Sequence, residues 1–176
     1  SLQQTAARYF VSQLDARYDQ IALVSFSSNP PSGSTYYGSY YNARTWANLT
    51  SNLSTVIDAI GSSPLAENEV GDPGLYPGGS TNMAAGISEG VRVLTQSPQA
   101  RENAVAVMIL LSDGTPTTRL NGSTPTGCDV QTGQGCSLPR QDTTAAAQEA
   151  AEKGVIIYTV FVGTAEFAES QALMLQ

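Results

Sequence analysis

Residues 104–118 read AVAVMILLSDGTPTT, and this stretch decides the fold class of the chain. Seven apolar residues, 105–111, run without a charge and are followed at once by Ser112, Asp113 and Gly114. An apolar run of this length that ends in turn residues is typical of a parallel strand buried on both faces of a sheet. Open α/β sheets bind ligands just beyond the carboxyl ends of such strands. Asp113 is therefore a candidate functional carboxylate; the alternative is that these three residues form only a polar turn.

A glycine-rich loop, residues 77–82, opens a second informative segment. Apolar residues follow it at helical spacing and predict a helix, namely Met83, Ala84, Ile87, Val91 and Leu94. Ser80, Thr81 or Asn82 is suited to cap that helix, which is the simplest interpretation of all three. The glycines also let the backbone approach a ligand, and Thr81 offers a hydroxyl oxygen there. A hydroxyl and a carboxylate from separate loops are hard ligands that suit Mg²⁺, Mn²⁺ or Ca²⁺.

Taken together, the loop before Met83 and the strand that ends in Leu-Ser-Asp-Gly resemble the von Willebrand factor type A domain. The order of segments agrees along nearly the whole chain, from a helix at 2–14 and a strand at Ile21–Phe26 to a helix–strand pair at 145–153 and 155–162. The resemblance implies one α/β domain over residues 1–176. Its sheet would be Rossmann-like, open and mostly parallel, with helices on both faces.

The resemblance also implies a metal-ion-dependent adhesion site, which three loops build in domains of that family. The first loop carries Asp-x-Ser-x-Ser, the second a threonine and the third an aspartate. The resemblance therefore implies Thr81 and Asp113 as metal ligands, with four residues beside them: Ser80, Asn82, Ser112 and Gly114. The first motif is absent from this sequence. Because two oxygen ligands are too few, we expect weak or no cation binding by the 176 residues alone.

The same comparison predicts that the chain is a fragment. The family's central first strand has no counterpart here, and residues 167–176 resemble a helix with no final strand after it. Without the central strand, Ile21–Phe26 and residues 105–111 should be neighbours that do not pair, roughly 9–10 Å apart. Upstream residues or another chain would have to supply the missing strand.

Other segments carry weaker signals. Residues 40–46 resemble the antiparallel edge strand of the family, and apolar spacing predicts a helix over residues 50–60. Residues 29–38 and 64–77 are rich in turn-forming residues and predict loops.

Composition narrows the setting of the protein. Fifteen acidic and eight basic residues give a net charge of −7, which argues against a nucleic-acid partner. No apolar run approaches the roughly 18–20 residues of a membrane span. Cys128 and Cys136 lie in a polar loop at 121–139, where a disulfide is favoured over two reduced thiols because free cysteines are usually buried. A disulfide indicates an oxidising, extracytoplasmic compartment: periplasm, cell surface or outside the cell.

Enzyme functions find little support in the sequence. There is no histidine, which removes the usual general base, and no phosphate-binding lysine loop. Phosphotransfer at Asp113 would need a second acidic cluster and usually a lysine, and Lys153 is the only lysine. The resemblance implies instead an adhesion module of bacterial surface or pilus type, which binds an acidic group of a protein or glycan partner through the cation. The alternative is a structural subunit of a surface filament whose metal site is incomplete and non-functional.

Overall fold

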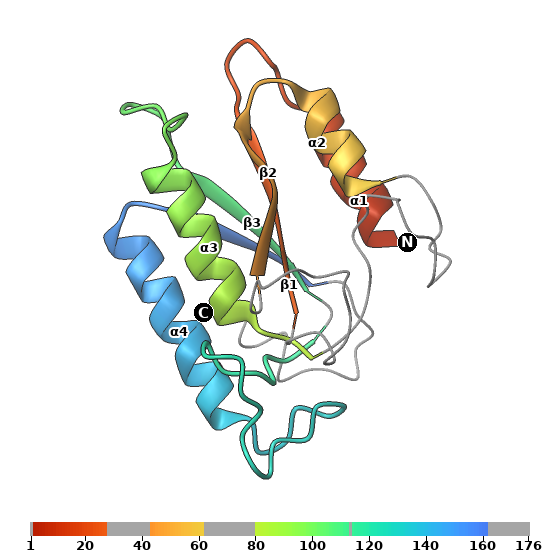
Figure 1. Ribbon diagram of the computed structural model, residues 1–176, viewed down its shortest axis with the longest axis vertical. Helices are drawn as coiled ribbons and strands as arrows, with labels where there is room; N and C mark the ends of the chain where they lie inside the picture. Colours follow the sequence, from red (N-terminus) through yellow and green to blue (C-terminus); the bar gives the residue numbers. More distant parts are fainter. Residues whose placement is uncertain (1, 28–42, 62–79, 113, 162–176) are drawn as a thin grey trace.

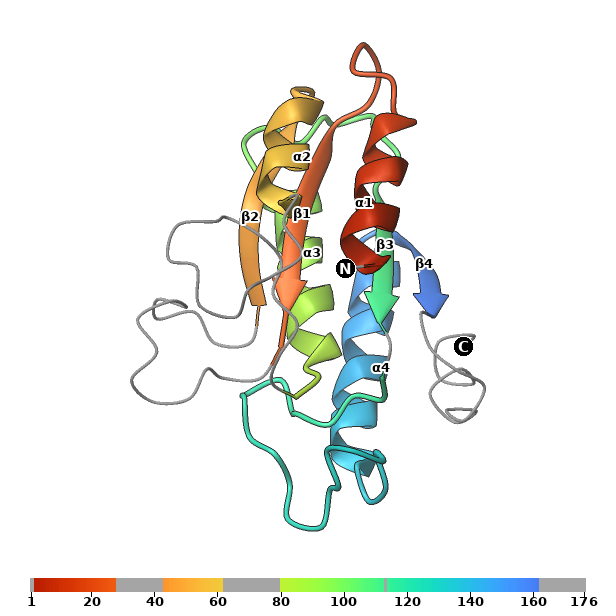
Figure 2. The ribbon, with the colours of Figure 1, turned by 90° about the vertical axis from the view of Figure 1, so that its right-hand side faces the viewer.

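The computed structural model describes residues 2–27, 43–61, 80–112 and 114–161. In chain order the elements are α1 (Leu2–Ser12), β1 (Ile21–Phe26), β2 (Ala43–Thr50), α2 (Leu53–Ile60), α3 (Met83–Gln96), β3 (Val107–Ser112), α4 (Ser137–Glu152) and β4 (Ile156–Phe161). The strands lie between α3 and α4 on one side and α1 and α2 on the other (Figures 1 and 2). The predicted α/β class, with helices on both faces, is therefore confirmed.

The described strands form two separate two-stranded sheets. β1 pairs with β2 in antiparallel fashion, and β3 pairs with β4 in parallel, from Val107 opposite Ile156 to Ser112 opposite Phe161. Within the described residues β1 and β3 are thus not paired with each other, which confirms that part of the prediction. The expected separation of one strand's width stays a prediction.

Helix α3 contacts both sheets through two glycines. A Cβ atom added at Gly86 would lie 2.6 Å from the ring of Phe26 in β1, and one added at Gly90 would lie 2.7 Å from the Cε of Met108 in β3. At Gly86 an added Cβ would meet the Phe26 ring, so the ring or the helix would have to shift. At Gly90 the neighbour is the flexible end of the Met108 side chain, which can move aside. Helix α3 therefore lies against one strand of each sheet. In the larger apolar cluster it also packs against α4.

Two apolar clusters hold the layers together. The larger joins α3, β3 and α4 through buried residues that include Met83, Ile87, Leu110 and Ala150. The smaller joins α1, α2 and β2 through Val11, Ala47, Val56 and Ile60. Fully burying a valine, leucine, isoleucine or methionine side chain contributes about 1.5–3 kcal/mol to the free energy of unfolding.

Several predicted boundaries need correction. Residues 40–42 of the expected edge strand lie outside the described residues. From Ala43 the strand runs on to Thr50, beyond its expected end at residue 46, because its residues continue to pair with β1 as far as Ile21. The helix expected from residue 50 therefore starts only at Leu53. The helix expected from residue 145 starts eight residues earlier, at Ser137, with Pro139 in its first turn, where proline is tolerated.

The strand expected to be buried on both faces is covered on one face only by the described residues. Leu110 is buried against α3 and α4. The opposite face carries Val107, and beside it on β4 lie Ile156, Tyr158 and Val160, all at least 40% exposed. The continuous apolar sequence of this strand therefore did not show whether one or both of its faces are covered.

Three predicted segments lie outside the described residues: the loops at 29–38 and 64–77 and the helix at 167–176. Among the helices that the structure describes, none is both long and apolar enough to cross a membrane.

Candidate functional site

The backbone of Thr81 is fixed to the segment that follows β3. The carbonyl of Thr81 accepts hydrogen bonds from the amides of Thr117 (2.9 Å) and Thr118 (3.1 Å). The amide of Thr81 donates to the hydroxyl of Thr117 at 3.0 Å. These three bonds join two loops that are far apart in sequence. They hold Thr81 at the carboxyl edge of β3.

The side chain of Thr81 lies beside Gly114. Its hydroxyl oxygen is 3.6 Å from the position that a Cβ atom on Gly114 would occupy. This distance is an ordinary van der Waals contact, so the Thr81 hydroxyl and the turn after β3 lie next to each other. Asp113, the residue before Gly114, lies outside the described residues, so its joint placement with Thr81 stays a prediction.

Asn82 has two structural roles. It is completely buried and caps α3, since its side-chain oxygen accepts a hydrogen bond from the amide of Ala85 at 3.0 Å. Its side-chain nitrogen donates to the carbonyl of Arg119 at 2.6 Å. The capping interpretation is therefore correct for Asn82. Its hydrogen bond to the carbonyl of Arg119 is a contact that the sequence did not indicate.

Ser80 and Ser112 flank the candidate ligands. Ser112 is buried at the end of β3, and its hydroxyl exchanges hydrogen bonds of 3.3 Å with the amide and carbonyl of Gly114. This small turn ends the strand just where the chain reaches the edge. Ser80 is half-buried at the entrance to α3.

An ion pair between Arg119 and Asp142 supports the edge from α4. The guanidinium donates two hydrogen bonds of 3.0 Å to the two carboxylate oxygens, and the amide of Leu120 adds a third. The hydrogen bonds from Arg119 hold the pKa of Asp142 below its ordinary value of 3.8, although partial burial opposes this. Sequence reasoning missed this pair because 23 residues separate its members and neither stands in a motif.

We expect Asp142→Asn to lower the free energy of unfolding by about 1 kcal/mol at pH 7, because Arg119 is partly exposed and the ion pair is screened. The lowered pKa makes the carboxylate's stabilisation complete above about pH 3.8 and progressively lost as pH falls further. Urea unfolding of both proteins should therefore give a difference that shrinks toward zero in acid. Glu149→Gln is the control on the same helix, since its ion pair with Lys153 is more exposed. An equal loss of unfolding free energy in both variants would contradict a larger stabilisation by the Arg119–Asp142 pair.

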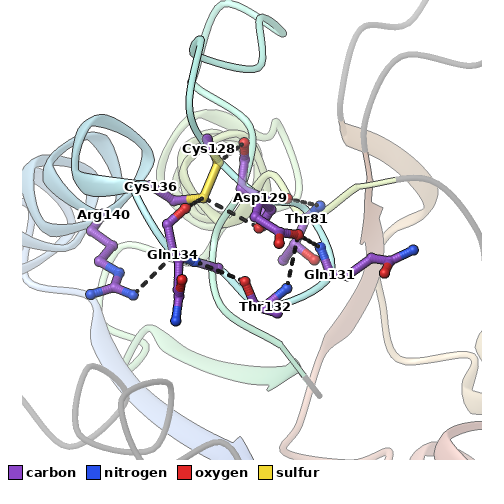
Figure 3. Close-up of a disulfide and its surroundings, with 10 residues drawn as sticks. Thr81, Cys128, Asp129, Gln131, Thr132, Gln134, Cys136 and Arg140 are labelled. Atoms are coloured by element: carbon purple, nitrogen blue, oxygen red, sulfur yellow. Dashed lines mark hydrogen bonds between the residues drawn. A yellow bond between two sulfur atoms is a disulfide. The ribbon is translucent and has the colours of Figure 1, made fainter.

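The predicted disulfide joins Cys128 to Cys136. The loop between them is closed by hydrogen bonds around Asp129, whose carboxylate accepts from the amides of Gln131 (2.8 Å) and Thr132 (3.2 Å) (Figure 3). These bonds keep the pKa of Asp129 below its ordinary value. Cys136 occupies the position just before α4, so the bond also fixes the start of that helix.

We expect protein recovered from an oxidising compartment to take up no alkyl group at either cysteine unless a reductant is added. The measurement is the intact mass after alkylation, with and without reductant. Two adducts on the unreduced protein would show free thiols at Cys128 and Cys136, and would remove the main support for an extracytoplasmic location.

The donor chemistry at this edge fits a hard divalent cation. The Thr81 hydroxyl oxygen lies next to Gly114, and hydroxyl oxygen is a ligand that Mg²⁺ and Mn²⁺ accept. Within residues 2–27, 43–61, 80–112 and 114–161, no group of three or more His, Cys, Asp or Glu side chains is placed to hold a metal ion. Any cation at this edge therefore depends on Asp113 and on further oxygen ligands.

Comparison with known families agrees with this geometry. The sequence model of the von Willebrand factor type A domain matches residues 2–175, which is nearly the whole chain. No curated protein and no solved structure matches the sequence at a significant level. The match covers both loops of the candidate site and all the described elements. The chain therefore belongs to the von Willebrand factor type A domain family.

Proposed function

We propose that this domain binds a protein or glycan partner through a divalent cation at the carboxyl edge of β3. Domains of the family typically act as protein-interaction modules rather than enzymes, and they commonly bind divalent cations. The observation that carries the proposal is the position of the Thr81 hydroxyl beside Gly114, the residue after Asp113.

In this proposal Thr81 and Asp113 hold Mg²⁺, Mn²⁺ or Ca²⁺, each directly or through a water molecule. An acidic group of the partner completes the coordination of the cation. The chain itself carries a net charge of −7, so an acidic ligand would otherwise be repelled. The cation supplies the local positive charge that makes the contact favourable.

The residues beside the proposed ligands hold the loop before α3 and the turn after β3 in place. Asn82 joins the start of α3 to the turn at Arg119, and Ser112 and Gly114 form the turn that ends β3. These contacts are made by the protein alone and would hold the Thr81 loop and the turn after β3 together before a cation binds. Such preorganisation reduces the cost of ordering the loops when a ligand arrives.

The disulfide supports an extracytoplasmic location for the domain, because such bonds persist in oxidising compartments. We propose that it belongs to a bacterial surface or pilus-associated protein. A second candidate function is structural: a filament subunit whose partners are other subunits. It would be favoured if no Asp-x-Ser-x-Ser motif were encoded upstream of Ser1.

The test is thermal unfolding of the full-length protein in Mg²⁺ or Mn²⁺ and in a chelator. Adhesion through a cation predicts a higher melting temperature with metal, because a ligand that binds only the folded state stabilises it. The same melts on residues 1–176 alone should show little or no shift. No metal effect on the full-length protein, together with no Asp-x-Ser-x-Ser encoded upstream of Ser1, would favour the structural function.

A further inference from the structure

The disulfide-bonded loop packs directly on the segment that follows β3. The contact is made by Gly133, whose backbone has a φ of +72°. A Cβ atom added there would lie 2.8 Å from the Cβ of Thr115 and 2.9 Å from its methyl carbon. Thr115 is itself buried, so it cannot move away into solvent. The loop and the segment are therefore in close contact at one defined point.

Gly133 is held in this position from two further sides. Its carbonyl accepts a hydrogen bond from the guanidinium of Arg140 in α4 at 3.2 Å. Its amide donates to the carbonyl of Asp129 at 2.7 Å, within the ring that the disulfide closes. The loop thus lies between α4 and Thr115, and the Cys128–Cys136 bond keeps its two ends together.

Thr115 lies two residues after Asp113 and two before Thr117. Thr117 bonds both the amide and the carbonyl of Thr81, as described above. A short series of contacts therefore leads from the disulfide loop through Thr115 and Thr117 to Thr81. A shift of Thr115 would therefore be passed through Thr117 to Thr81.

We propose that the Cys128–Cys136 loop is a positioning device for the Thr81 edge, so that ligand binding there depends on the oxidised disulfide. The dependence of ligand binding rests on the proposed function; the positioning of Thr81 does not. A dithiol supplies two electrons and two protons, the sulfur–sulfur bond breaks, and two thiols form at Cys128 and Cys136. The dithiol is itself oxidised to a cyclic disulfide. The loop then loses its closure, and Gly133 is no longer held against Thr115.

Three glycine variants separate this contact from backbone strain. Gly133→Ala places a methyl group against Thr115, whereas Gly127→Ala and Gly154→Ala add one where no other atom lies within 4 Å. All three positions have a similar left-handed backbone, with φ of +72°, +83° and +74°. The cost of forcing alanine into that conformation is therefore matched, and only Gly133→Ala disturbs the contact.

The first readout is amide hydrogen exchange in the full-length protein. Gly133→Ala, and separately treatment of wild type with dithiothreitol, should speed exchange at Thr117 and Thr118 by about tenfold or more, because their bonds to Thr81 open more often. Gly127→Ala and Gly154→Ala should change it by less than about twofold. Exchange at Ile156, whose amide bonds to Ala106 in the β3–β4 region, should rise far less than exchange at Thr117 and Thr118 in the reduced and Gly133→Ala samples. The double variant Cys128→Ser with Cys136→Ser should behave as the reduced protein does.

The second readout is Mn²⁺ affinity of the same proteins, which should fall about tenfold in the reduced and Gly133→Ala forms and stay unchanged in the two control variants. Unchanged exchange at Thr117 and Thr118 would overturn the positioning role. Equally faster exchange at Ile156 would also overturn it, since the loop would then act on global stability alone. If wild type binds no Mn²⁺, the proposed function fails, and the exchange rates still decide whether the loop positions Thr81.

Discussion

Asp113→Ala is expected to abolish the rise in melting temperature that Mg²⁺ or Mn²⁺ gives the full-length wild-type protein. At a free metal concentration of 100 times Kd, the wild type should gain about 2.7 kcal/mol. For a domain of this size that corresponds to roughly 5–10 °C. The variant should lose this gain because the proposed site loses its charged ligand. Without metal its melting temperature should be close to that of wild type, since a carboxylate at a strand tip contributes little to packing.

Asp58→Ala is the matched control for Asp113→Ala. It removes an exposed aspartate from α2, which lies on the other side of the strands from α3 (Figure 1). It should keep the full metal-dependent shift. A shift that survives Asp113→Ala, or one that Asp58→Ala also removes, would contradict the assignment of the site.

Asn82→Ala is expected to lower the free energy of unfolding by about 2–3 kcal/mol. The variant loses the cap of α3 and leaves the partly buried carbonyl of Arg119 without its amide partner. Loss of a helix cap costs about 1 kcal/mol, and an unpaired buried polar group costs about 1–3 kcal/mol. Denaturant unfolding of the metal-free protein measures the difference.

Asn52→Ala provides the comparison for Asn82→Ala. Asn52 stands at the same position of α2, but it is exposed and its side chain makes no capping hydrogen bond. Its replacement should cost less than about 0.5 kcal/mol. Similar losses in the two variants would show that Asn82 acts only through helix propensity and does not join α3 to the turn at Arg119.

The elements that sequence predicted well are those whose signal is local. The apolar spacing after residue 82 placed α3, and the turn residues after Leu111 placed the end of β3 within one residue. The two cysteines stood in one short polar loop, so their pairing needed no knowledge of the fold. The Thr81 edge was predicted from two loops considered together with a family resemblance, since neither loop was specific by itself.

The contacts that sequence did not predict are those between distant residues of ordinary type. Nothing about Arg119 or Asp142 marks them as partners, and nothing about Gly133 marks it as the residue that touches Thr115. The start of α4 was placed too late because its first residues, from Ser137 to Thr144, are mostly polar and include a proline. Pro139 and Thr143 are buried within this segment, so tertiary packing rather than local preference decides that it is helical.

The account's central claim is that Thr81 and Asp113 share one divalent cation, and anomalous diffraction from crystals of the full-length protein with Mn²⁺ tests it most directly. The account predicts an anomalous peak at the carboxyl edge of β3, between the Thr81 hydroxyl and the Asp113 carboxylate, with a ligand oxygen about 2.1 Å away. A peak at another place, or no peak at a saturating Mn²⁺ concentration, would contradict it.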